Sequence, residues 1–431
     1  MSCTNWRMRT RASATDARTR GRAAAWLAAA ALALVVSYAA PAAAARPHLA
    51  FAVIGNTLRT SADETATRRL LDAIALDGQI AFVAYDGNLK GSAENCSDSL
   101  YAQRQQLLDT SPLPLIVVPG EHDWSACGSA RAGGYDVTER LDLLRQTLFG
   151  NNVSLGQTSL PLKRESEVAR FRAYRENVRW EFDDTVFVGL NVVGGNNHYS
   201  TAGGRNGEYD DRAIATSFWL EHSAEYARRR NAGALVVFVE ADPEFERYER
   251  PERFAWLRLG SGRTRDGYLE FKRSLVKAAR TFRGPLIVIH AAHTSLPRGF
   301  AIDQPLFDDK GARMTNVTRI AIAPRERDLQ WVRIDVNFAK APPFHVSVRR
   351  IPPNVTASTP QPAQALPPGA TSAASGSIPG LMPAPAPSSL PSYFPASEIP
   401  ASEPPLLPES RTAPAPAPAV PPRPASVQGG S

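Results

Sequence analysis

The sequence LPLIVVPGEHDWSAC, residues 113–127, joins a buried strand to three ionisable side chains. Residues 115–118 are leucine, isoleucine and valine, which predicts a strand in the interior of an α/β sheet. A proline and a glycine end this strand, and Glu121, His122 and Asp123 follow together. Ligands of open α/β sheets bind at the C-terminal ends of the strands, because the loops there diverge around a crevice. The pattern therefore suits metal binding or acid–base chemistry, and the alternative is a polar turn whose charges face water.

Two earlier stretches repeat this arrangement. Residues 49–54 and 79–86 predict two more buried strands, and we expect helices between the three strands over residues 61–76 and 100–108. This βαβαβ alternation predicts a parallel sheet with helices on its faces. Each of the three strands ends in a glycine followed by a polar residue: Gly55-Asn56, Gly87-Asn88 and Gly120-Glu121.

The second half of the chain predicts further strands and helices. A buried strand over residues 234–239 ends at Glu240, and another delivers His290 and then His293. The alternating apolar and polar residues over 317–351 predict half-exposed antiparallel strands. Apolar periodicity predicts three more helices, over residues 140–148, 213–230 and 268–281.

The first 45 residues predict an export signal. Six arginines and one aspartate give this leader a charge of +5 out of the total +7, and an apolar run over residues 26–40 follows them. Small residues over 41–45 suit signal peptidase, so we expect cleavage and a periplasmic or secreted protein. The alternative is an uncleaved anchor in the inner membrane, which would be the chain's only membrane contact. Because the excess of basic residues belongs to the leader, the charge does not indicate a nucleic-acid partner.

The last 80 residues differ in composition from the rest. Of the 36 prolines, 22 lie between residues 352 and 424, and alanine and serine make up nearly half of the other residues there. Such a segment buries too little apolar surface to offset its ordering entropy, so we expect a disordered tail over 352–431. The tail is either a spacer that contacts envelope components or a neutral extension. The sequence thus predicts one folded domain over residues 46–351.

Two cysteines follow the leader, Cys96 and Cys127. In an exported chain this number predicts one disulfide, and the alternative is two unpaired buried thiols.

The strand-end motifs, taken in order, resemble those of the calcineurin-like metallophosphoesterases, in particular their exported bacterial branch. The resemblance covers about residues 49–351. It also includes the NNHYS segment before a Trp-Leu helix and a closing segment around Trp331. It implies an α+β fold, a four-layer α-β-β-α sandwich, with a two-metal site of divalent Mn, Fe, Zn or Mg at the strand ends. It implies phosphoester hydrolysis, with a phosphorylated small molecule as substrate. Cys96 and Cys127 stand where exported members carry a pair.

The first two ligand positions depart from the family's pattern. The family reads Gly-Asp at both strand ends, whereas this chain reads Gly55-Asn56 and Gly87-Asn88. An amide oxygen can bind a metal but brings no charge, so the carboxylate that bridges two cations is lost unless Asp86 takes its place.

The remaining positions are altered in part. At the third strand end His122 matches a ligand position and Asp123 the general-acid position, while an ungapped match keeps His122 as the acid. Glu240 occupies the fourth ligand position, and His290 and His293 retain imidazoles with changed spacing. If they are not metal ligands, Glu240 is a capping or surface carboxylate, and the two histidines are polar residues whose hydrogen bonds are satisfied within the cleft. The resemblance therefore gives as metal ligands Asn56, Asn88, His122, Glu240, His290 and His293, and as catalytic residues His122 and Asp123.

Two hypotheses about function follow from these changes. In the first, the chain is a family member whose hydrolytic activity is impaired or lost, and whose cleft binds a ligand or an envelope partner without turnover and without a metal. In the second, it is an active hydrolase with a mononuclear metal site, for which zinc suits the nitrogen and oxygen ligands. Nucleophile elbows, dinucleotide-binding glycine motifs and P-loops do not occur in the sequence.

Overall fold

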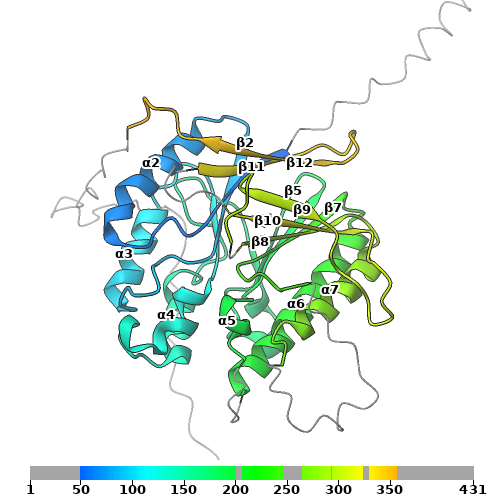
Figure 1. Ribbon diagram of the computed structural model, residues 1–431, viewed down its shortest axis with the longest axis horizontal. Helices are drawn as coiled ribbons and strands as arrows, with labels where there is room; N and C mark the ends of the chain where they lie inside the picture. The colour runs from blue at the N-terminus through cyan, green and yellow to red at the C-terminus, as the bar shows by residue number, and fades with distance from the viewer. Residues whose placement is uncertain (1–48, 200–205, 246–264, 293, 324–329, 357–431) are drawn as a thin grey trace, which may run out of the picture. The chain divides into compact units, whose positions relative to one another are not determined.

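The protein is described by a computed structural model over residues 49–199, 206–245, 265–292, 294–323 and 330–356. Within these ranges two β-sheets pack against each other, and helices cover the outer face of each sheet (Figure 1). The predicted export signal, residues 357–431 of the predicted Pro-rich tail and His293 lie outside the described residues. None of the described helices is long and apolar enough to cross a membrane.

The first sheet carries the three strands that the sequence predicts to be parallel. Its order is β12-β11-β1-β2-β3, and β1, β2 and β3 pair in parallel. The chain returns to this sheet near its end, where β11 pairs antiparallel with both β1 and β12. The strand bounds are β1 Leu49–Ile54, β2 Ile80–Asp86, β3 Leu115–Val118, β11 Gln330–Val336 and β12 Phe344–Arg350.

The second sheet has the order β4-β5-β6-β7-β8-β10-β9, and β6, β7, β8 and β10 run parallel. One expectation for this sheet is wrong in part. β10 is antiparallel to β9, as expected, but it pairs in parallel with β8 on its other side and is mostly buried, not half-exposed. The bounds are β4 Lys163–Arg164, β5 Val178–Phe182, β6 Thr185–Gly189, β7 Ala234–Val239, β8 Leu286–Ala291, β9 Phe300–Asp303 and β10 Val317–Ile322.

The helices form the two outer layers. Those covering the first sheet are α2 (Glu64–Ala75), α3 (Asp98–Leu108) and α4 (Val137–Thr147), and those covering the second sheet are α6 (Gly207–Arg229) and α7 (Leu269–Phe282). The short α5 (Gly194–Asn197) lies in the loop after β6, and its residues Gly195 and Asn196 have non-helical φ and ψ. Two of these helices, α3 and α4, begin at a side-chain N-cap. The Ser97 hydroxyl accepts from the backbone N–H of Leu100 at α3, and the Asp136 carboxylate accepts from the N–H groups of Thr138 and Glu139 at α4.

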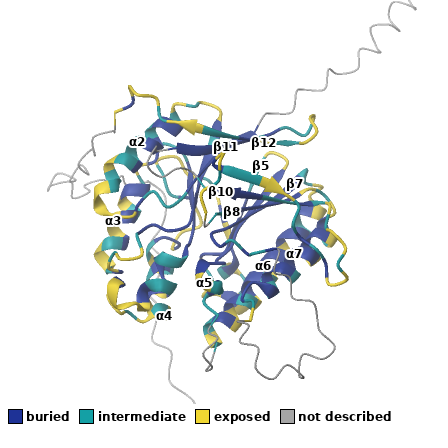
Figure 2. Ribbon diagram, viewed as in Figure 1, coloured by how far each residue is buried: buried dark blue, intermediate teal, exposed yellow. Residues whose placement is uncertain are grey.

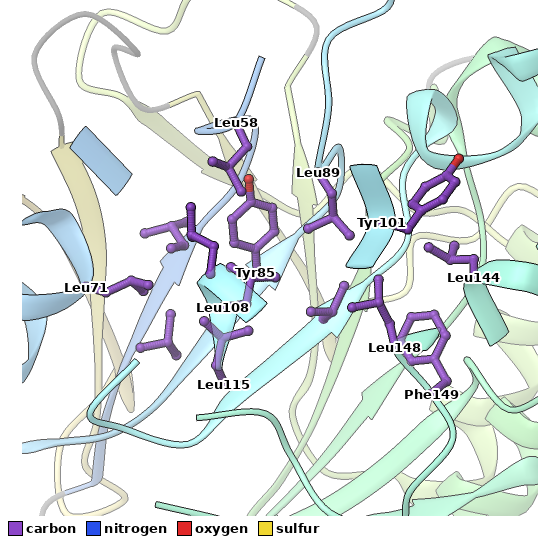
Figure 3. Packing of buried hydrophobic residues seen from close by; sticks show 14 of the residues in the cluster. Leu58, Leu71, Tyr85, Leu89, Tyr101, Leu108, Leu115, Leu144, Leu148 and Phe149 are labelled. Atoms are coloured by element: carbon purple, nitrogen blue, oxygen red, sulfur yellow. The ribbon is translucent and has the colours of Figure 1, made fainter. Parts of the chain in front are cut away.

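Three apolar cores separate the four layers, and burial is densest in the sheets (Figure 2). Between the sheets, Phe51 and Phe82 of the first sheet meet Phe187 and Phe238 of the second, with ring centroids 5.0–6.1 Å apart. Figure 3 shows the core under α3 and α4, where Leu108, Leu144 and Phe149 pack over the first sheet. The layered α-β-β-α arrangement expected from the sequence is therefore present.

Strand alternation fixes which residues face the second sheet. Phe82 and Ala84 belong to the core between the sheets, while Val83 and Tyr85 belong to the core under the helices. Because successive side chains of a strand point to opposite faces, Asp86 at the end of β2 lies on the inter-sheet side.

The predicted disulfide is confirmed. Cys96 and Cys127 are bonded, with their Cα atoms 5.9 Å apart and a sequence separation of 31. Both are fully buried. The bond ties the loop that follows β2 to the loop that follows β3, so it constrains two of the predicted site loops directly.

Candidate functional site

The strand-end loops converge because glycines let them approach closely. A Cβ at Gly120 would lie 2.4 Å from the backbone nitrogen of Asn88, and one at Gly87 would lie 2.0 Å from Cγ of Glu240. Gly87 also has a φ of 79°, which favours glycine. The asparagines that follow the first two strands have φ values of 55° (Asn56) and 50° (Asn88), a left-handed conformation that asparagine tolerates well. The backbone conformation at these strand ends is thus a second reason for a glycine followed by an asparagine.

Glu240, at the end of β7, joins the loops from both sheets. Glu240 is only 4% exposed to solvent. Oε1 accepts a hydrogen bond from Nδ2 of Asn88 at 3.0 Å, and Oε2 accepts from the backbone N–H groups of Gly194 at 2.8 Å and Glu121 at 3.2 Å. Three N–H donors stabilise the buried charge, so Glu240 acts here as a capping carboxylate.

Asn88 uses both ends of its amide in the same network. While Nδ2 donates to Glu240, Oδ1 accepts from the backbone N–H of His122 at 2.8 Å. Asn88 is also buried. Two predicted ligand positions, Asn88 and Glu240, therefore lie together but direct their oxygens at N–H groups of the protein.

The carboxylate of Asp123 also accepts hydrogen bonds from backbone N–H groups. Oδ1 accepts from Leu89 N–H at 2.6 Å and Oδ2 from Gly120 N–H at 2.8 Å. The residue is fully buried, and burial raises the pKa of its carboxyl to about 7 against the opposing effect of those two bonds. Asp123 thus pins the β3 loop to the β2 loop beside the disulfide.

The neighbouring imidazoles have different surroundings. His122 is half-buried, and burial lowers the pKa of its ring below the ordinary histidine value. His290, at the end of β8, is fully buried; its Nδ1 lies 2.8 Å from the carbonyl oxygen of Ala291 and its Nε2 lies 4.0 Å from Oδ1 of Asp242. His290 lies on the face of β8 that packs toward the α6 and α7 core, because Leu286 and Val288 belong to that core.

Asp86 has the opposite environment to Glu240. It is 3% exposed, and neither carboxyl oxygen has a hydrogen-bonding partner among the described residues. Burial, and then the like charge of Glu240, raise the pKa of this carboxyl well above its usual range. Asp86 lines a cavity of ≈ 20 Å³ together with Asn56 and Gly55.

One polar group beside the site was given no role from the sequence, although its histidine belongs to the NNHYS segment. Nδ1 of His198 lies 3.0 Å from Oε2 of Glu208, and Arg212 donates to the other oxygen of that carboxylate at 2.5 Å. The His198 ring meets Trp124 edge to face, with centroids 5.2 Å apart, and the Arg212 guanidinium lies over the same indole. Burial raises the pKa of Glu208, but the bond from His198 and the charge of Arg212 outweigh it and lower the pKa to about 2.

The signal that could have pointed to His198 is its loop. Asn196, Asn197 and His198 have φ values of 58°, 55° and 55° in succession, after Gly195 at 60°. Consecutive left-handed residues are rare, because each costs conformational energy outside glycine. The first of the two glycines lies close to a neighbouring loop: a Cβ at Gly194 would lie 2.5 Å from a carboxylate oxygen of Glu121, so that side chain would have to move.

The donor set does not fit a dinuclear divalent centre. No three His, Cys, Asp or Glu side chains converge on a metal-sized point within the ranges that the structure covers. Asn88 and Glu240 bind each other and backbone N–H groups, so their oxygens do not address a common cation. The mononuclear site stays a prediction, because one of its ligands, His293, lies outside the described residues.

Comparisons with known proteins give only distant likenesses. No family model matches the chain, and no curated protein matches it. It is similar to the solved structure of a purple acid phosphatase, PPD1, from yellow lupin (Lupinus luteus) seeds, with 11% identity and a TM-score of 0.39 over 72% of this chain; it spans 52% of that protein. It is also similar to GAP50, the anchor in the inner membrane complex of Plasmodium, with 9% identity and a TM-score of 0.37 over 72% of this chain and 87% of that one. Both likenesses are too distant to assign a fold family or an activity.

Proposed function

We propose that this chain is an exported protein of calcineurin-like phosphoesterase fold whose metal-dependent phosphoester hydrolysis is impaired or lost, and whose strand-end loops bind a ligand or an envelope partner without turnover. The observation that carries the proposal is the contact between Asn88 Nδ2 and Glu240 Oε1 at 3.0 Å. In the family pattern both positions hold metal ligands. Here one is a hydrogen-bond donor to the other.

The physical argument is the loss of charge at the metal-binding positions. Two divalent cations a few ångströms apart need anionic oxygens, and above all a bridging carboxylate, to offset their repulsion. Asn56 and Asn88 are neutral, and Glu240 already accepts three hydrogen bonds. Capturing a metal would require Glu240 to give up buried bonds that are each worth about 1.5–3 kcal/mol.

A turnover assay tests this proposal. The purified chain is assayed with an aryl phosphate in the presence of Mn, Zn, Fe or Mg, beside the double variant Asn56→Asp/Asn88→Asp. We expect no metal-dependent turnover in the native chain. Turnover that appears in the double variant would support descent from a hydrolase. Turnover in the native chain that disappears in His290→Ala would overturn the proposal.

The second candidate is an active hydrolase with a mononuclear metal site. It is favoured by one observation, the buried His290 Nε2 at 4.0 Å from Asp242 Oδ1, since an imidazole beside a carboxylate is a ligand pair that zinc accepts. Stoichiometric zinc in the native chain, lost in His290→Ala, would select this candidate.

Export is supported by the composition of the leader and by the disulfide, which persists in oxidising compartments. Fractionation of cells expressing the full chain, followed by N-terminal sequencing of the recovered protein, tests it. Recovery from the periplasm with a new N-terminus between residues 40 and 50 is the expected result, and an intact leader in the membrane fraction would favour the anchor instead.

A further inference from the structure

We infer that a groove on the first sheet, at the opposite end from the strand-end loops, binds a small organic anion through its carboxylate or phosphate oxygens. The groove has a volume of ≈ 410 Å³, which lies in the range of small-molecule sites. It is lined by residues of β11 and β12, of the loop that joins these strands, and of the turn before β2. The inference goes beyond the proposed function and does not depend on it.

The position of the groove separates it from the predicted metal ligands. β11 is antiparallel to β1, and Asp335 of β11, which lines the groove, pairs with Ala50 at the start of β1. Asn56 follows the other end of β1. Because β1 is six residues long, its two ends are roughly 15–20 Å apart. The groove therefore shares no residue with the strand-end site.

Strand alternation places the polar side chains of the groove on the helix side of the sheet. Alternate residues of β11 and β12, such as Ile334 and Val346, belong to the core between the two sheets. The residues next to them, among them Arg333, Asp335 and His345, therefore face the other way. Asp335 and His345 are directly opposite each other in the register of the two strands.

The side-chain oxygens of the groove already accept hydrogen bonds from the protein. Arg333 is 6% exposed, and its guanidinium donates to both carboxylate oxygens of Asp335 at 2.7–3.1 Å, to Oε1 of Gln79 at 2.7 Å and to the carboxylate of Asp77 beside the groove. In the loop after β11, Oδ1 of Asn337 accepts from a backbone N–H at 2.9 Å. The acceptors of the groove are thus engaged.

The donors of the groove, by contrast, are left over. Within the described ranges, the amide nitrogens of Gln79 and Asn337 and the charged ends of Lys340 and Arg349 have no hydrogen-bonding partner. A site whose acceptors are used and whose donors remain takes a ligand that is rich in acceptors. Ionised carboxylate and phosphate groups fit this description, because their oxygens accept hydrogen bonds and strengthen them by their charge.

Charge favours the same class of ligand. Three cations face two carboxylates when Asp77 is counted with the groove: Arg333, Lys340 and Arg349 against Asp77 and Asp335. Both carboxylates pair with Arg333, so Lys340 and Arg349 keep their charges for a ligand. The guanidinium of Arg349 also has the planar fork that binds carboxylate and phosphate through two parallel hydrogen bonds.

The loop that carries Lys340 is held in shape without a ligand. The backbone N–H of Asn337 donates to the carbonyl oxygen of Pro343 at 2.8 Å, and that of Lys340 donates to the carbonyl oxygen of Asn337 at 3.1 Å. On the opposite side Arg333 fixes Gln79. A groove whose walls are already ordered loses less conformational entropy when it binds.

The test is isothermal titration calorimetry of the purified chain at fixed pH and ionic strength, with a chelator present to exclude divalent ions. The probes are citrate, glycerol 3-phosphate and, as the uncharged comparison, glycerol. We expect saturable binding of one anion per chain with a Kd on the order of 1 mM or lower, and no binding of glycerol. The anion that binds more tightly identifies the preferred group, carboxylate or phosphate.

Two double variants with the same change of charge show where the anion binds. Lys340→Gln/Arg349→Gln removes both charged donors of the groove and should raise Kd by about tenfold or more. Lys310→Gln/Arg172→Gln changes two exposed cations outside the groove and should leave Kd within about twofold of the native value. All four side chains are exposed, so we expect both variants to fold with the Tm of the native chain.

Three outcomes would overturn the inference. They are no saturable binding of either anion, equal losses of affinity in the two double variants, and a Kd that changes in Asn56→Asp/Asn88→Asp but not in Lys340→Gln/Arg349→Gln. The last result would move the anion from the groove to the strand-end loops.

Discussion

Two buried carboxyl groups at the strand ends, Glu240 on β7 and Asp86 on β2, have opposite surroundings. Glu240 accepts hydrogen bonds from Asn88, Gly194 and Glu121, whereas Asp86 has no hydrogen-bonding partner among the described residues. The comparison teaches that an ionisable residue at a strand end is not by itself a sign of chemistry. The end of β7 uses its charge to hold loops together, while the end of β2 keeps a carboxyl group that only a proton or a cation can neutralise.

The largest effect is expected at the β7 end. Replacing Glu240 by alanine leaves three N–H donors without their acceptor, at about 1–3 kcal/mol each when they are buried. We expect the free energy of unfolding in urea to fall by at least about 3 kcal/mol. The matched control Glu221→Ala removes a surface pair with Lys277 and should cost under about 1 kcal/mol. If Glu240→Ala lowers the free energy of unfolding no more than the control does, Glu240 does not hold the loops together.

The disulfide is the next largest contribution. The double variant Cys96→Ala/Cys127→Ala opens a loop closed over 31 residues and should lower the free energy of unfolding by about 2–4 kcal/mol. Urea unfolding of the oxidised chain, the reduced chain and the variant measures it, and the last two should agree. Two titratable thiols in the unfolded, unreduced protein would contradict the bond itself.

A third prediction concerns pH and the His198–Glu208 pair. The pKa of Glu208 is lowered to about 2, below an unfolded value of about 4.3, so its pairing stabilises the fold above that value and is lost as the pH falls toward 2. As the pH falls through this range, the free energy of unfolding of the native chain should decrease by on the order of 2 kcal/mol more than that of Glu208→Gln. If the difference in the free energy of unfolding between the two proteins stays constant from pH 5.5 to pH 3, the pair does not make stability depend on pH.

The smallest effect is expected for Asn88→Asp in the presence of a chelator. The change removes the donor to Glu240 and places two carboxyl groups together, which should cost about 1–2 kcal/mol. Asn231→Asp is the matched control, because Asn231 is exposed and has a similar φ of 51°. If the two variants are equally stable, the Asn88–Glu240 contact does not stabilise the site.

Much of the fold could be predicted from the sequence, because the signals are local. The apolar runs before Gly55, Gly87 and Gly120 are β1, β2 and β3, and the pairing of Cys96 with Cys127 followed from their number in an exported chain. The pairing of β10 could not be predicted, since a short apolar run does not say which neighbour it joins or in which direction.

Only part of the candidate site could be predicted from the sequence. Its positions could be predicted, because strand ends follow from the strands. The state of each side chain could not: Asn88 and Glu240 are 152 residues apart, and His198, the last of four consecutive left-handed residues, meets Glu208 ten residues further along the chain. The environment of Asp86 depends on which face of β2 it occupies and on what the opposite sheet offers there. Such information is tertiary, and no spacing within a motif contains it.

The most direct test of the account is the divalent metal content of the native chain beside Asn56→Asp/Asn88→Asp, after incubation with zinc, manganese and iron and removal of unbound ions. Elemental analysis measures the ions per chain, and unfolding of the same samples measures whether they stabilise it. We predict no stoichiometric divalent ion and no change of Tm in the native chain, because Asn88 and backbone N–H groups occupy Glu240. The double variant, with two carboxylates restored, should bind a metal and gain stability from it. Two divalent ions per native chain, with a raised Tm, would contradict the central claim.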